Sequence, residues 1–252
     1  MKEFLSLILF FSASCFAIGQ ENSPRVELNS NQIIYVTASA EETSKATVTC
    51  YSRRDSGSPW IKEIGPSPAR IGRDGIALPN DKKEGDGKTP SGIWPIGYAF
   101  GSASEAPIKT RSPYRQLTSR DFWIDSAHSP LYNMWFSGEI PQVSHEVLHN
   151  LPIRYEVVLT TLYNTHPIIP EKGSAIFIHI WLSPSTPTSG CVSVSREDML
   201  KILAWIDPSK SPMLEVSSHQ NFNPNPYKSF SLFSNTFLAV LEYVEHHSVL
   251  YR

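Results

Sequence analysis

Residues 174–199 read S-A-I-F-I-H-I-W-L-S-P-S-T-P-T-S-G-C-V-S-V-S-R-E-D-M. Isoleucines alternate with other residues in its first part, which predicts a strand with the isoleucines in the core and His179 on the opposite face. Valines alternate in the same way after Cys191 and predict a second, short strand. Ser195 suits the N-cap of a helix that ends before Pro208. The stretch therefore predicts a histidine strand, a cysteine strand and a helix in succession.

The chain on either side of this stretch has the pattern of a mainly β protein. Further strands are expected at 32–40, 45–54, 60–64, 70–78, 155–162 and 213–216. We expect one mixed-sheet sandwich or barrel, with the helix after Ser195 packed on it. The aromatic-rich segment 98–137 is interpreted as an irregular insertion that covers the catalytic face.

Cys191 follows Gly190, whose missing Cβ lets a substrate backbone approach the sulfur. A thiol becomes a strong nucleophile when it loses its proton, and pairing with an imidazole such as that of His179 can lower its pKa. The alternative is a structural disulfide between Cys50 and Cys191, since the apolar run at residues 4–17 predicts export and an exported chain meets an oxidising compartment. The strand histidine and the glycine have no role in a disulfide, so the sequence favours a nucleophile and its base.

These residues resemble the L,D-transpeptidase catalytic domain, also called the YkuD or ErfK domain. The family signature is a histidine on a strand followed by [S/T]-x-G-C, here His179 and Thr188-Ser189-Gly190-Cys191. A second block, G-D-G-K-T-P-S-G-I-W-P-I at 85–96, resembles the family's G-x-x-K-T-P-x-G-x-[FYW] stretch. The resemblance spans residues 30–217, and the ending P-T-x-G-C-V is similar to one subgroup of the family.

The resemblance implies roles for the residues of the signature. Cys191 is then the nucleophile, His179 the base, and the backbone carbonyl of Ile180 the third catalytic element. Backbone N–H groups around Gly190 and Cys191 are the natural donors to an oxyanion. The side chains expected to contact the substrate are Thr188, Ser189, Trp181, Ser193, Arg196 and Arg73.

Two of these positions depart from the family pattern. Ser189 stands where common members carry His or Lys, and Ser193 stands where they carry Arg or Asn. The second departure removes the usual partner of a substrate carboxylate. Arg196 and Arg73 are the expected replacements.

The resemblance also implies an activity on peptidoglycan stem peptides without a cofactor. Attack on the carbonyl of the third stem residue releases the terminal D-alanine and leaves a thioester. An amine then forms a 3-3 cross-link or attaches a wall-anchored lipoprotein, whereas water trims the stem. A cysteine-dependent peptidoglycan amidase or carboxypeptidase of the same fold and a non-catalytic cell-wall-binding module are the alternatives.

His145-Glu146-Val147-Leu148-His149 matches H-E-x-x-H, the signature of zinc hydrolases. Pro141 and Pro152 limit a helix here to about two turns. The usual third ligand is also missing, so we expect a short surface helix without metal.

Composition and the chain ends complete the prediction. A formal net charge of −2 gives no electrostatic footprint for nucleic acid. Residues 1–19 read as a signal peptide, which implies export to the periplasm or cell envelope, with membrane association if it is not cleaved. Residues 218–252 are expected to form an extension with an amphipathic helix.

Overall fold

A computed structural model describes residues 30–218 except 79, 105–108 and 152. The expected signal peptide and C-terminal helix lie outside the described residues. The strands are β1 (Gln32–Ala38), β2 (Lys45–Ser52), β3 (Ile61–Arg70), β4 (Ile76–Ala77), β5 (Thr89–Pro90), β6 (Gly92–Gly101), β7 (Tyr114–Gln116), β8 (Asp121–Ile124), β9 (Met134–Ser137), β10 (His145–Val147), β11 (Val158–Thr161), β12 (Phe177–Ile180), β13 (Val192–Val194) and β14 (Met213–Ser217). The helices are α1 (Arg196–Trp205) and the 3-10 turns η1 (Leu148–Asn150) and η2 (Pro208–Lys210).

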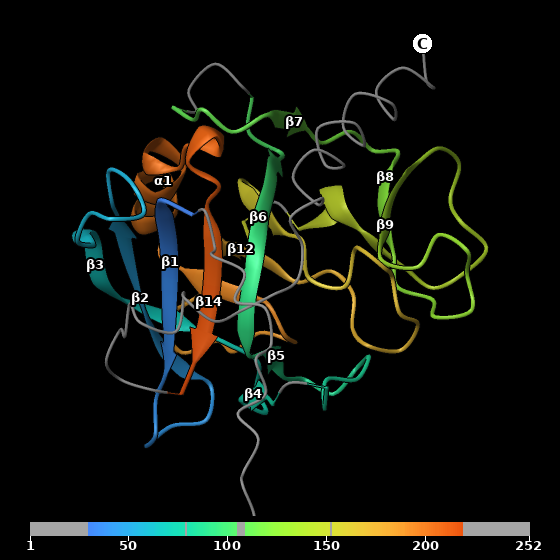
Figure 1. The fold of residues 1–252 in the computed structure, drawn as a ribbon. Coiled ribbons are helices and arrows are strands. Elements are labelled where there is room, and N and C mark those ends of the chain that lie inside the picture. The colour runs from blue at the N-terminus through green and yellow to red at the C-terminus, as the bar shows by residue number, and fades with distance from the viewer. Residues whose placement is uncertain (1–29, 79, 105–108, 152, 219–252) are drawn as a thin grey trace, which may run out of the picture.

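The main sheet closes on itself as a barrel (Figure 1). Its strand order is β11-β12-β13-β3-β2-β1-β14-β6-β7, and pairing of β11 with β6 closes the ring. Pairs β1–β14 and β12–β13 are parallel, whereas β1–β2, β2–β3 and β14–β6 are antiparallel. The prediction of a mainly β fold built on a mixed sheet is confirmed, and closure leaves few exposed edges.

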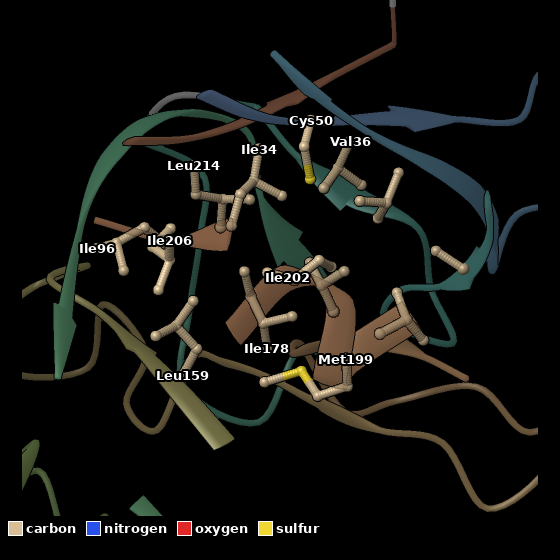
Figure 2. Close-up of a cluster of buried hydrophobic side chains, with 14 of the residues drawn as sticks. Ile34, Val36, Cys50, Ile96, Leu159, Ile178, Met199, Ile202, Ile206 and Leu214 are labelled. Atoms are coloured by element: carbon tan, nitrogen blue, oxygen red, sulfur yellow. The ribbon is translucent and has the colours of Figure 1, made fainter. Parts of the chain in front are cut away.

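Figure 2 shows the main core, which the strands and α1 enclose together. Ile178 from β12 and Met199 and Ile202 from α1 are fully buried in it. Ser195 caps α1 by accepting a hydrogen bond from the Asp198 N–H at 3.0 Å. The predicted cap and the inward isoleucines of the histidine strand are therefore as expected. Among the described residues, no helix is long and apolar enough to cross a membrane.

Two predicted strands, 60–64 and 70–78, are wrong in their bounds. β3 runs without a break from Ile61 to Arg70. Within the rest of the predicted strand 70–78, Ile76–Ala77 alone is a strand. Gly65 and its neighbouring proline suggested a break, but the strand continues through them because bulges occur where it pairs with β2. A Cβ at Gly65 would lie 2.4 Å from the Val48 carbonyl oxygen, so the two strands approach closely there.

The segment 98–137 was predicted to be irregular, and this prediction is wrong. It contains β7 and two strands of a small sheet with the order β10-β8-β9. This sheet packs on the outside of the barrel through an aromatic cluster, in which Trp123 meets the Phe177 ring edge-on with centroids 4.9 Å apart. The segment thus covers the outer face of β12, the strand that carries His179.

The predicted surface helix at 145–149 is also wrong. Residues 145–147 form β10, whose Glu146 pairs with Trp123 of β8, and a single 3-10 turn follows. Leu148 is fully buried in the aromatic cluster, so the segment is anchored by strand pairing and burial. Two histidines four residues apart cannot share one helical face here, which removes the geometry of the zinc hydrolase signature.

Candidate active site

His179 and Cys191 lie on the outer face of two adjacent parallel strands. In the β12–β13 register Ile178 pairs with Val192 and His179 pairs with Ser193. Since Ile178 and Val192 point into the barrel core, the alternating residues His179, Cys191 and Ser193 face outward. All three line one open cavity of about 450 Å³.

The Cys191 thiol is hydrogen-bonded to the backbone of the neighbouring strand. Its Sγ donates to the Ala175 carbonyl at 3.1 Å and accepts from the Phe177 N–H at 3.4 Å. Burial raises the pKa of the Cys191 thiol to about 12, although the Phe177 N–H acts in the opposite direction. The free protein therefore holds a neutral thiol at physiological pH, rather than the thiolate expected from pairing with an imidazole.

The His179 ring has a fixed orientation and tautomer. Its Nδ1 lies 2.8 Å from the Ile180 carbonyl oxygen, which can only accept, so Nδ1 carries the proton and Nε2 is free to accept one. Burial lowers the pKa of His179 to about 4, which keeps the ring neutral. The carbonyl contact is the one that the family resemblance implied for Ile180. Both hydrogen bonds of the Cys191 Sγ go to the backbone, so no direct bond joins thiol and imidazole in this state.

The loop at residues 188–191 is held by hydroxyl groups from both signature blocks. Thr188 Oγ1 donates to the Cys191 carbonyl at 2.6 Å and accepts the Gly190 N–H at 3.1 Å. Thr89, from the G-D-G-K-T-P block, donates to the same carbonyl at 3.2 Å. Gly190 has φ +148°, and a Cβ there would lie 3.0 Å from the Lys88 carbonyl oxygen. Since the Gly190 N–H is engaged, the Cys191 N–H is the better candidate donor to an oxyanion.

The structure separates the two arginines that the sequence suggested as carboxylate ligands. Arg73 lines the cavity, with its Nη1 3.5 Å from the Ser189 hydroxyl. Arg196 is outside the cavity lining and binds both carboxylate oxygens of Glu156 at 2.8 Å and 2.6 Å. Trp181, Thr188 and Ser189 line the cavity together with Ser193.

Several polar residues of the cavity were missed by the sequence analysis, and Arg154, Glu146 and Tyr155 are the most relevant to its chemistry. Arg154 and Glu146 both line it, and the Tyr155 hydroxyl donates to Glu146 Oε1 at 2.8 Å. Burial raises the pKa of Glu146, and the Tyr155 ring meets the His179 ring edge-on at 5.7 Å. The only signal for Glu146 was the H-E-x-x-H match, which pointed to different chemistry. Nothing in the sequence around Arg154 indicated its place.

The second cysteine of the described chain belongs to another part of the molecule. Cys50 is fully buried in the barrel core on β2 (Figure 2). It is a free cysteine, as is Cys191. The structure therefore contains no Cys50–Cys191 disulfide. Within residues 30–218, apart from the gaps noted above, no group of three or more His, Cys, Asp or Glu side chains is placed to hold a metal ion.

Comparison with known proteins agrees with the geometry. The family model of the L,D-transpeptidase catalytic domain, YkuD, matches residues 46–215, a range that includes both signature blocks. No curated protein and no solved structure gives a significant match. A match over this much of the chain, with a cysteine and a histidine of the family signature opening on one cavity, places the protein in the L,D-transpeptidase catalytic-domain family.

Proposed function

We propose that this protein is an exported L,D-transpeptidase that forms a thioester between Cys191 and a peptidoglycan stem peptide. The observation that carries the proposal is that His179 on β12 and Cys191, which directly precedes the parallel strand β13, face the same outer side and line a single cavity. The apolar run at residues 4–17 supports export to the periplasm or cell envelope.

Acylation begins from a neutral thiol and a neutral imidazole. His179 Nε2 removes the Cys191 proton as the sulfur attacks the carbonyl of the third stem residue, because a thiol with a raised pKa attacks slowly without a base. The Cys191 N–H stabilises the oxyanion, and the Ile180 carbonyl stabilises the imidazolium that forms. The C–N bond then breaks, and His179 protonates the departing D-alanine amine.

Two arginines of the cavity can bind a peptide that bears carboxylates, although the acidic side chains Glu84, Asp125 and Glu146 also line it. Arg154 and Arg73, which lie far apart in the sequence, both line the cavity. A guanidinium can bind a carboxylate through two parallel hydrogen bonds. Because Arg154 and Arg73 line the cavity and Arg196 does not, we propose Arg154 and Arg73 as the carboxylate ligands. The acyl group then passes to an amine, either of a second stem peptide or of a wall-anchored lipoprotein.

The experiment that tests this function measures products. Mature protein is incubated with a stem tetrapeptide and a second stem peptide that has a free side-chain amine, and the mixture is separated by mass. A cross-linked dimer supports transpeptidation, whereas tripeptide alone supports the hydrolytic alternative, a carboxypeptidase.

Three variants give the comparison its controls. Cys191→Ala should abolish both products, and His179→Ala should lower turnover by on the order of 10²- to 10⁴-fold, the usual contribution of a positioned base. Cys50→Ala should retain activity, because Cys50 lies in the core and away from the cavity. Products that persist in Cys191→Ala would contradict the proposal.

A further inference from the structure

Glu146 is a carboxyl group of the cavity that the acylation step does not use. It lies on β10 and pairs with Trp123 of β8, so both side chains leave the small sheet on the same face. The Trp123 ring packs against Phe177, which precedes His179 by two residues and shares its side of β12. Glu146 therefore faces the strand that carries His179, and it lines the same cavity as His179 and Cys191.

The two oxygens of the Glu146 carboxyl have different surroundings. Oε1 accepts a hydrogen bond from the Tyr155 hydroxyl at 2.8 Å, and the Tyr155 ring meets the His179 ring edge-on at 5.7 Å. Oε2 has no hydrogen-bond partner among the residues that the structure describes and, unlike the Ser193 hydroxyl, it is not sealed from solvent. Tyr155 therefore fixes the carboxyl close to His179, and Oε2 is left to bind a group that enters the cavity.

An amine acceptor needs such a group, because it reaches the site as an ammonium. A side-chain amine has a pKa of about 10, so at neutral pH it is protonated and has no lone pair for attack. Its nitrogen has to lose two protons before the amide is complete, and the free ring nitrogen of His179, Nε2, can take one of them. The other proton needs a second base, and a carboxylate suits this role because it also attracts the cation.

The surroundings of Glu146 make it a stronger base than an exposed glutamate. Burial raises the pKa of its carboxyl, and Asp125 acts in the same direction, whereas the Tyr155 hydrogen bond and Arg154 lower that pKa. Enclosure in the same cavity lowers the pKa of an ammonium. The two values therefore move towards each other, and transfer of a proton from the nitrogen to Oε2 becomes easier.

We infer that Glu146 Oε2 binds the acceptor ammonium and takes its first proton, so that a neutral amine meets the thioester. The inference rests on the proposed function. The amine lone pair then attacks the thioester carbon and a C–N bond forms, while His179 Nε2 takes the second proton. The C–S bond breaks, His179 returns its proton to the Cys191 sulfur, and Glu146 releases its proton to water.

The test compares Glu146→Gln with Glu146→Asp. Glutamine keeps an oxygen for the Tyr155 hydroxyl but cannot act as the base, whereas aspartate keeps a carboxylate. The acyl-enzyme is formed with a stem tetrapeptide, excess donor is removed, and decay at pH 7.5 is followed over a range of acceptor concentrations. Two acceptors are used, a stem peptide with a side-chain ammonium and methoxyamine, a weak base that is uncharged at this pH.

We expect Glu146→Gln to slow aminolysis by the stem peptide on the order of 10²-fold, the lower end of the usual contribution of a positioned base. The reaction with methoxyamine should stay close to wild type, because that amine has no first proton to lose. Since water competes for the same thioester, Glu146→Gln should also release more tripeptide and less cross-linked dimer. Glu146→Asp should recover part of the rate with the stem peptide.

Glu156→Gln is the matched control, since Glu156 lies outside the cavity lining and binds Arg196, and it should behave as wild type with both amines. Unchanged aminolysis by the stem peptide in Glu146→Gln, or an equal loss with both amines, would overturn the inference. Loss of acyl-enzyme formation in both Glu146 variants would also overturn it. Failure of the proposed function is a different result, because the wild-type protein would then form no acyl-enzyme at all.

Discussion

Cys191 and His179 are both uncharged in the free protein, because the same enclosed site disfavours the thiolate and the imidazolium. Around them, Arg154 lowers the pKa of both groups, whereas Glu146 raises the pKa of the thiol. Burial is the main cause of the raised pKa of the thiol, and these two side chains adjust it in opposite directions.

Arg154→Gln tests this balance at the level of one residue. Loss of the positive charge should raise the pKa of Cys191 further, so that alkylation by iodoacetamide at pH 8 becomes slower than in wild type. Arg196→Gln is the control, since that side chain is exposed and is engaged by Glu156. The rates are measured by mass spectrometry of the Cys191 peptide, and equal slowing in both variants would show that the effect is not local.

Helix α1 packs into the barrel core behind the site. It follows β13 directly, and its buried side chains Met199, Ile202 and Leu203 fill the barrel core behind the outward-facing pair. Backbone pairing of β12 with β13 sets their register, and the packed helix supports the inner faces of the two strands.

Ile202→Ala should therefore destabilise the whole domain by about 2–5 kcal/mol, the usual cost of truncating a fully buried isoleucine. Lys201→Ala on the exposed face of the same helix should change the free energy of unfolding by no more than about 0.5 kcal/mol. Urea unfolding followed by fluorescence measures both. A small effect of Ile202→Ala would contradict the view that α1 supports the barrel.

At this scale the sequence predicted well where the pattern was local. Alternation placed His179 and the isoleucines on opposite faces, and Ser195 marked the start of α1. The prediction for 145–149 was wrong, because the choice between helix and strand there depended on pairing with β8, more than twenty residues earlier in the chain. The same long-range pairing brings Glu146 to Tyr155 and both to the cavity, so neither residue could be recognised from its neighbours.

In the whole molecule, the candidate active site lies on the outer face of the closed barrel, next to the small β10-β8-β9 sheet (Figure 1). This arrangement buries His179 to 6% exposure without placing it in the core. The burial has a consequence for stability, because a neutral buried histidine resists protonation that the unfolded chain accepts.

We expect the protein to lose stability as the pH falls from 6.5 towards 4. The folded pKa of His179 is about 4 and its ordinary value is 6.5, so the unfolded state binds more protons between these values and is favoured by acid. The full contribution, about 3 kcal/mol by linkage, is present above pH 6.5. His179→Gln should show a flatter stability curve over this range in urea titrations at fixed pH steps, and an identical curve would contradict the lowered pKa.

The central claim is that Cys191 carries the acyl group. Intact-mass and peptide-mass spectrometry of the mature protein, quenched after incubation with a stem tetrapeptide and no acceptor, tests it directly. We expect an added mass equal to the tetrapeptide minus D-alanine, located on the peptide that contains Cys191 and absent from Cys191→Ala. An adduct on any other residue, or turnover of the tetrapeptide by the Cys191→Ala variant, would contradict it.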